Sequence, residues 1–327
     1  MGKQVKTPRF YVDMPTFLHA TGQLGWDNGN GGAELLYMNC ANPYLNTQFE
    51  IGVDENIKTS FPINFVGLLN HNLAGTELVI KGNDTEIPST NNVINYDKVY
   101  NGTTMFTFVE DNQVWEKFAI EQVLEDGAEA TSKQLGSFVV GKYFDCPNSP
   151  DLNLTMSRRF DGIKKQKTIG GKTLANIYYD GATEWTMNNA DGTTYKYPPF
   201  ELDTTGDDFN QKVKSGLGRK GLRSWKLSFS YIAESDMWME NEVSNTLISD
   251  GESTPEDNDP NPMLSDNSFN FVWNCTLGGT LPFIFTDDKD SNAPDRYAIC
   301  NFRENTLSVQ QVAFNTYKLS ITIDEVA

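Results

Sequence analysis

The side chains that most often perform acid–base or metal chemistry are scarce in this sequence. Histidine occurs only at His19 and His71, so a metal site built from several histidines, or a cysteine–histidine couple, has almost no material. The sequence lacks the H-E-x-x-H, G-x-S-x-G and G-x-x-x-x-G-K-[ST] motifs, and no G-x-G-x-x-G motif opens a helix. The common hydrolase and nucleotide-binding chemistries are therefore disfavoured, and we expect no catalytic residue and no cofactor.

Carboxylates are the one abundant group with chemical potential. A glycosidase needs two of them at a set separation, but a sequence with 44 acidic residues contains many close pairs that have no such role. The runs at residues 287–290 and 203–208 offer oxygen ligands for calcium, yet neither matches the D-x-[DN]-x-[DN]-G loop. We interpret both runs as solvated turns, and a glycan-cleaving enzyme is the least favoured alternative.

The overall charge and the apolar runs exclude several classes of partner. The 327 residues include 44 acidic and 26 basic side chains, and the formal charge of −18 disfavours naked nucleic acid. No run approaches the roughly 18 consecutive apolar residues of a membrane-spanning helix, and we expect neither a membrane span nor a signal peptide. Cys40, Cys146, Cys275 and Cys300 are scattered, which favours buried free thiols and synthesis in a reducing compartment.

Strand patterns dominate the sequence. Short runs rich in β-branched and aromatic residues are bounded by Gly, Asn, Asp and Pro, which predicts an all-β chain. In residues 317–323, the apolar Tyr317, Leu319, Ile321 and Ile323 alternate with polar residues and should share one face of a strand. Residues 115–125 fit either a helix or two short strands. The other predicted strands lie at residues 61–69, 77–81, 105–109, 138–143, 152–156 and 225–232.

Three segments have the composition of loops. Residues 21–33 are rich in Gly and Asn and predict a mobile or ligand-facing loop. Residues 125–134 predict an exposed connection, and we place a domain boundary between residues 133 and 134. Residues 244–268 combine acidic residues with prolines, which predicts a solvated acidic excursion. The predicted domains are therefore 1–133 and 134–327.

Basic residues concentrate in two short stretches of the second half, upstream of the acidic excursion. A basic strip and an acidic strip on one molecule suit head-to-tail contact between copies, because opposite charges then meet at each junction. Two solvated hairpins that meet no partner explain the same pattern equally well. The candidate interface residues are Arg158, Arg159, Lys164, Lys165, Arg219 and Arg223.

Several segments resemble proteins of tailed-bacteriophage virions. The run F-P-I-N-F-V-G-L-L-N-H-N-L at residues 61–73 resembles the strand and corner of a discoidin-like, galactose-binding jelly roll, and residues 135–152 look like the segment that leads out of it. The W-x-L-x-F run from Trp225, the aromatic run at 269–273 and the G-G-x-x-P-F-x-F run from Gly278 are similar to the β-barrel of tail-tip and distal-tail, or baseplate hub, proteins. The strand faces of Trp225, Leu227 and Phe229 and of Phe283 and Phe285 would then close one core.

This resemblance implies an N-terminal jelly-roll β-sandwich followed by a β-barrel or sandwich with a long acidic loop. It implies a structural subunit of the virion, made in the host cytoplasm, whose partners are copies of itself and other virion proteins in a ring at the tail tip or baseplate. Residues 1–15 would form an arm that orders only when it docks onto a neighbour. A capsid decoration protein is one alternative.

Another alternative is a carbohydrate-binding module for attachment to a host surface glycan. The candidate glycan-contact residues are Trp26, Tyr44, His71 and Trp115. Aromatic side chains stack on sugar rings, but aromatic residues in strands belong far more often to a core. His71 lies between two asparagines directly after an apolar strand, where it more often closes a corner by bonding to the backbone.

Overall fold

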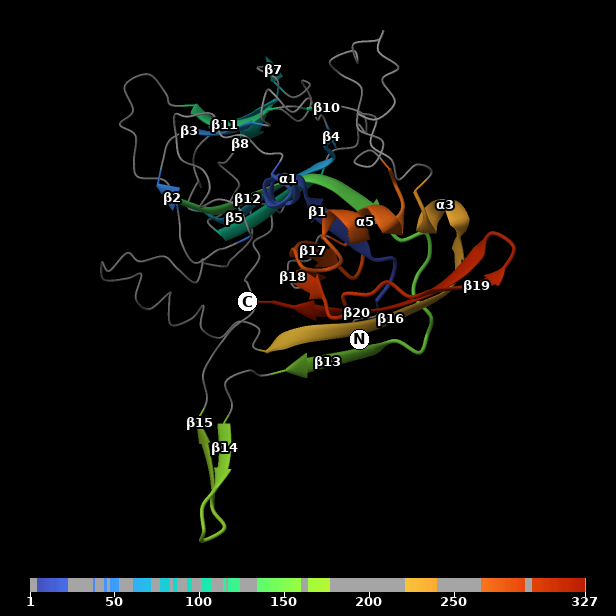
Figure 1. Cartoon of the computed structure of the whole chain (residues 1–327). Helices are drawn as coiled ribbons and strands as arrows, with labels where there is room; N and C mark the ends of the chain where they lie inside the picture. The colour runs from blue at the N-terminus through green and yellow to red at the C-terminus, as the bar shows by residue number, and fades with distance from the viewer. Residues whose placement is uncertain are drawn as a thin grey trace.

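The structure is a computed structural model and is rich in β-strands (Figure 1). It describes residues 5–22, 38, 44–45, 48–52, 61–71, 77–82, 85–86, 93–95, 102–107, 114–115, 117–123, 134–159, 164–176, 221–239, 266–291 and 296–326. Strands hold more than half of these residues and helices hold few, which confirms the prediction of a mostly-β chain.

The largest sheet joins strands from both ends of the chain (Figure 1). Within the described residues it is 11-stranded and antiparallel, in the order β13-β16-β20-β18-β17-β1-β12-β5-β9, with β19 beside β20 and β2 beside β12. The bounds are β1 (Arg9–Asp13), β2 (Tyr44–Leu45), β5 (Phe65–His71), β9 (Gly102–Thr107), β12 (Gln134–Asp145), β13 (Thr155–Arg159), β16 (Leu222–Ala233), β17 (Phe283–Thr286), β18 (Tyr297–Phe302), β19 (Val309–Ala313) and β20 (Thr316–Glu325).

Three smaller sheets complete the described strands. A five-stranded sheet has the order β3-β11-β6-β7 with β8 beside β6, while β4 pairs with β10 and β14 pairs with β15. Their bounds are β3 (Gln48–Gly52), β4 (Phe61–Pro62), β6 (Glu77–Gly82), β7 (Thr85–Glu86), β8 (Val93–Asn95), β10 (Val114–Trp115), β11 (Lys117–Val123), β14 (Lys164–Lys167) and β15 (Thr173–Asn176). The ambiguous residues 115–125 thus contain two strands, β10 and β11, and no helix over the part described.

Most predicted strands are present, with shifted ends. Residues 61–69 contain β4 and most of β5, and residues 105–109 overlap only the end of β9. The strand predicted at residues 152–156 is wrong at its start, because Leu152 lies in a turn and β13 begins at Thr155. In that turn Leu154 donates its N–H to the Asp151 carbonyl at 3.3 Å.

Strand β1 occupies the middle of the large sheet, between β12 and β17. Phe10 opposes Phe144 on one side and Phe285 on the other, so both edges of β1 are hydrogen-bonded within this chain. Both of its faces are buried as well, because Phe10 packs into the larger core and Tyr11 into a second, smaller one. The prediction that residues 1–15 order only on docking to a neighbour is therefore wrong for residues 5–15, which lie in the body of this chain.

Aromatic side chains from several strands fill the larger core. Trp225, Leu227 and Phe229 alternate into it from β16, and Trp225 lies 5.1 Å from Phe285 of β17, measured between ring centroids. This contact confirms that the two predicted strand faces share one core. Along β20, Leu319, Ile321 and Ile323 are buried and Tyr317 is half-buried, as the alternation predicted; the other buried members of β20 are Thr322 and Glu325.

Three short helices lie between described strands: α1 (Met14–Ala20), α3 (Glu234–Met237) and α5 (Phe269–Cys275). The run at 269–273, which the resemblance assigned to an aromatic segment of the barrel, forms most of α5. Ser268 caps this helix, since its hydroxyl oxygen accepts the N–H of Phe271 at 3.4 Å. Phe269 and Phe271 then enter the larger core.

A buried carboxylate, Asp13, stands where β1 passes into α1. Its side chain accepts the hydroxyl of Thr16 and, at 3.4 Å, the N–H of Val140 on β12. Burial raises the pKa of Asp13 from 3.8 to about 7, and these hydrogen bonds only partly oppose the rise. Asp13 is therefore held largely protonated in the folded chain at mildly acidic pH.

We expect folding stability to fall as pH rises through this range. The unfolded chain releases the Asp13 proton near pH 3.8 and the folded chain near pH 7. The stabilisation that this group contributes is therefore fully present below pH 3.8 and is lost as the pH rises to about 7. Between pH 5 and pH 7 the loss from this one group is roughly 2 kcal/mol. Asp13→Asn removes the titrating proton at nearly constant shape. Urea unfolding at both pH values should show a smaller loss in this variant, and equal losses would contradict the assignment.

Candidate functional site

The exposed basic residues predicted as an interface gather around strand β13 and the hairpin that follows it. Within the described strands, β13 pairs only with β16 and forms the first strand of the large sheet, and all five of its residues are exposed. Arg158 and Arg159 stand at its end. Lys164 and Lys165 lie on β14, which pairs with β15, and we call this hairpin, residues 164–176, the arm.

The arm is closed by a well-defined turn. Thr168 and Lys172 are joined by a backbone hydrogen bond of 2.8 Å, and the Thr168 hydroxyl accepts the N–H of Lys172 at 3.1 Å. Gly171 has a φ of +78°, which an L side chain rarely adopts, so glycine is required there. Ile169 sits in this turn fully exposed, and Leu174 on β15 is 59% exposed. Figure 1 shows the arm extending away from the rest of the described chain.

Arg223 was predicted as an interface residue, but it is buried. Its guanidinium donates to both carboxylate oxygens of Glu325, at 3.1 and 3.0 Å, and its backbone N–H donates to the same carboxylate at 2.8 Å. The guanidinium also donates to the Tyr297 carbonyl at 2.6 Å and lies 4.8 Å from the ring centroid of Trp225. Arg223 is 5% exposed, so the prediction that places it in an exposed basic strip is wrong.

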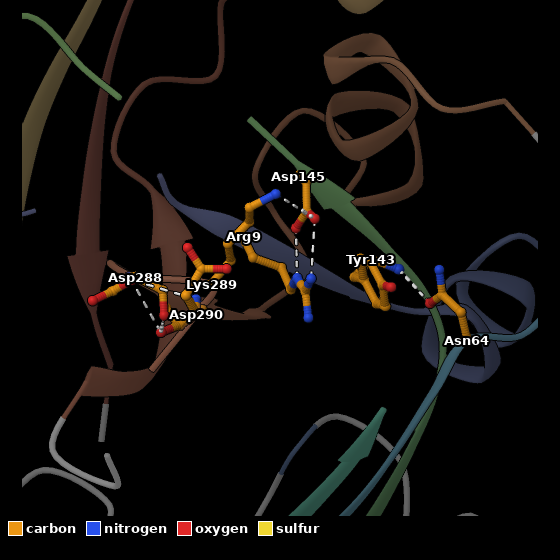
Figure 2. A network of polar contacts seen from close by, with 8 residues as sticks. Arg9, Asn64, Tyr143, Asp145, Asp288, Lys289 and Asp290 are labelled. Atoms are coloured by element: carbon orange, nitrogen blue, oxygen red, sulfur yellow. Dashed lines mark hydrogen bonds and ion pairs between the residues drawn. The ribbon is translucent and has the colours of Figure 1, made fainter. Parts of the chain in front are cut away.

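A charged junction holds β1 against β12 and against the turn after β17 (Figure 2). The guanidinium of Arg9 donates two hydrogen bonds to Asp145, one of them at 3.0 Å, and lies 3.8 Å from the ring centroid of Tyr143. Lys289 reaches the same carboxylate at 3.4 Å. On the far side of β12, the Asn64 side chain accepts the N–H of Tyr143 at 2.8 Å. These contacts match opposite charges and orient strands, which is a structural role.

The acidic run at residues 287–290 differs from the predicted solvated turn. Asp287 and Asp288 are buried, and Arg296 contacts both carboxylates, at 2.9 and 3.3 Å, while Lys6 contacts Asp288 at 3.1 Å. Burial raises the pKa of Asp287, and the neighbouring Arg296 opposes that rise. The run is solvated only at its end, where Asp290 is exposed. These acids therefore neutralise cations of the same chain.

The candidate glycan-contact residues are only partly brought together. Tyr44 on β2 and His71 at the end of β5 both stand opposite Leu135 of β12, one on each side. Their backbones are therefore about 10 Å apart, two strand spacings. Trp115 lies in the separate pairing of β10 with β4, and Trp26 falls outside the described residues.

The remaining predictions concern thiols, metals and membranes. Cys146, Cys275 and Cys300 are buried thiols that form no disulfide within the part of the chain described, as predicted, and burial raises the pKa of the first two; Cys40 lies outside the described residues. Over the described ranges, no three His, Cys, Asp or Glu side chains are grouped to hold a metal ion, and no helix is long and apolar enough to cross a membrane. Arg219 and residues 23–33, 124–133, 203–208 and 240–265 fall outside those ranges.

Sequence reasoning missed the apolar part of the arm. Ile169 and Leu174 stand among four lysines, and a pattern of charge gives no weight to apolar residues. The signal was present as T-I-G-G-K, because a Gly-Gly pair predicts a tight turn and places the isoleucine before it at the tip. No sequence pattern marks Asp145 and Glu325 as acidic partners, because the arginine that each one binds lies more than 100 positions away.

A scan against protein-family models, a search of curated proteins and a search of solved structures each found no match to this chain.

Proposed function

We propose that this chain is a structural subunit of a tailed-phage virion that assembles into a ring at the tail tip or baseplate through contacts between its copies. The observation that carries the proposal is the arm. Its described side chains from Lys165 to Leu174 are all exposed, and its two strands pair only with each other within the described chain. A two-stranded hairpin of this kind has marginal stability alone in water, and contact with a partner would stabilise it.

The rest of the described surface supports an assembly role over catalysis. Strand β13 is exposed and carries two arginines, and its second edge has no partner among the described strands; such an edge readily accepts another chain. The buried charges Arg9, Arg223 and Asp288 are matched inside the chain and hold the fold together. The exposed basic side chains at the β13 edge are suited to contact with an acidic protein surface.

The finer architecture belongs to the same proposal. We assign residues 1–133 to a jelly roll with an N-terminal arm and residues 134–327 to a hub-like barrel with the acidic excursion at 244–268, following the sequence resemblance. The large sheet qualifies this division, because β1 of the first unit lies between β12 and β17 of the second. The two units would then share one sheet, because β2 and β5 of the first unit also pair with β12 of the second.

The direct test is the mass of the purified full-length chain, measured by native mass spectrometry and sedimentation. We expect one closed oligomer, weakened when Arg158, Arg159, Lys164 and Lys165 are all changed to glutamate. Opposed charges contribute most at low ionic strength, so the difference should be largest in low salt.

A matched control keeps the charges. Exchanging each of these four arginines and lysines for the other basic residue should leave assembly unchanged, and circular dichroism should show an intact fold in both variants. A wild-type chain that stays monomeric at high concentration would refute the ring, and an unaffected oligomer in the glutamate variant would remove the basic strip from the interface. Binding of residues 1–327 to a glycan array would favour the attachment-module alternative.

A further inference from the structure

We infer that the arm of one copy docks onto an apolar patch at the opposite end of the β13–β16–β20 sheet of the next copy. This inference rests on the proposed self-assembly and names the two surfaces that would meet. The patch, which we call the end patch, consists of Leu152, Tyr231, Val312 and Phe314. Their exposed fractions are 94%, 72%, 43% and 88%, respectively.

Backbone contacts bring the segments of the end patch together. Asp151, beside Leu152, accepts the hydroxyl of Ser230 at 2.6 Å, which places the turn before β13 next to the end of β16. Ala233 of β16 opposes Thr316, which also opposes Ala313 of β19. Three segments therefore end at one place and present large apolar side chains to solvent, an arrangement that commonly marks an interaction surface.

The rim of the end patch is acidic. Residues 148–154, 228–236 and 309–318 contain three acidic residues, Asp151, Glu234 and Asp236, and one basic residue, Lys318, which opposes Gln310 of β19. The Glu234 side chain is exposed, and its backbone N–H donates to the Asn315 carbonyl at 3.1 Å, which fixes α3 beside the turn that carries Phe314. A partner that fits this surface must combine an apolar tip with positive charge.

The arm has that combination. It contains four lysines and no acidic residue, so removing its charge from the formal −18 leaves −22 on the remainder of the chain. Lys165 and Lys167 share one face of β14, and Ile169 stands exposed at the turn beyond them. The apolar tip can cover Tyr231 and Phe314 while the lysines meet Glu234 and its acidic neighbours.

The position of the two surfaces calls for a second copy. Arg159, at the end of β13 from which the chain runs to the arm, opposes Leu222, the first residue of β16, whereas the end patch lies at the last residues of β16. A strand of this length spans roughly 40 Å. Figure 1 shows the arm extending from the side of the sheet where β13 ends, away from β19 and α3. Such a head-to-tail contact repeats and closes into a ring when its rotation permits.

A mixing experiment with full-length chains tests the pairing. The arm variant carries Ile169→Asp and Leu174→Ser, and the patch variant carries Tyr231→Ser and Phe314→Asp. Each variant alone should be monomeric in sedimentation velocity, because one of its two surfaces fails. An equimolar mixture should form a 1:1 dimer that grows no further, since only one intact arm and one intact patch remain per pair.

Charge exchange provides a second, independent test of the pairing. Lys165→Glu and Glu234→Lys should each weaken assembly about tenfold or more at low salt, and the two changes in one chain should restore it, because the altered arm then meets the altered patch of the next copy. Thermal melts of the single variants should match the wild type, since both side chains are exposed.

The outcomes separate this inference from the function on which it rests. If the wild type assembles and the arm and patch variants assemble equally well, the docking inference is wrong and the ring proposal stands. A mixture that stays monomeric also overturns the pairing of these two surfaces. If the wild type itself never assembles, both proposals fail.

Discussion

Replacing Trp225 with alanine should destabilise the fold by about 3–5 kcal/mol and leave little soluble protein. Trp225 is fully buried in the larger core, and its ring centroid lies 5.1 Å from that of Phe285. The guanidinium of Arg223 lies 4.8 Å from the ring centroid of Trp225. Alanine at this position leaves a cavity between β16 and β17 that the sheet cannot close. Urea unfolding followed by circular dichroism measures the loss.

Two further variants keep this prediction testable if the alanine variant is insoluble. Trp225→Phe retains a large aromatic ring and removes the indole N–H, which is buried and has no hydrogen-bond partner among the described residues, so its cost should be only about 1–2 kcal/mol. Lys226→Ala changes the neighbouring exposed residue of β16 and should alter stability by less than about 0.5 kcal/mol. An alanine variant at position 225 that melts like the parent would contradict the buried face of β16.

Removing the charge of Glu325 should cost about 3 kcal/mol or more. Glu325→Gln leaves the guanidinium of Arg223 in a buried site without the carboxylate that now accepts two of its hydrogen bonds. The side chains of Arg223 and Glu325 are 5% and 1% exposed, so water cannot replace the lost partner. The free energy of unfolding in urea gives the effect directly.

The adjacent residue supplies a matched control. Asp324 accepts two hydrogen bonds from Arg303, at 2.8 and 2.7 Å, and this contact lowers the pKa of Asp324. Here the Arg303 side chain is 53% exposed, so Asp324→Asn should cost less than about 1 kcal/mol. Equal losses at positions 324 and 325 would show that burial does not set the strength of these two pairs.

The sequence predicted the strands that have one buried face. Along β16 and β20 the apolar residues alternate with polar ones, and this period-2 pattern reports directly which side chains enter the core. Strand β1 gives no such pattern, because the larger core covers one of its faces and the smaller core covers the other. Its partners lie in β12 and β17, far along the chain. The sequence of β1 therefore predicts a terminal segment that has no contacts within its own chain.

The sequence likewise predicted the exposed charges better than the buried ones. Local composition located the exposed lysines of the arm, which meet no opposite charge within their own segment. It failed at Arg223 and at Asp288, because their burial depends on Glu325, Lys6 and Arg296, and a sequence pattern does not reveal which distant carboxylate a guanidinium will meet. The sequence also does not show that the apolar residues of the end patch are exposed, because their exposure depends on how the strands of the folded chain pack.

The central place of β1 determines the order in which the sheet can be completed during synthesis. Arg9–Asp13 is synthesised before β12, and β17, which pairs with the other edge of β1, is synthesised about 270 residues after β1 (283 − 13). At about 5–20 residues per second this interval is on the order of tens of seconds. Through that time a half-finished strand presents an open edge, so the nascent chain is most prone to mispairing before residue 283 emerges.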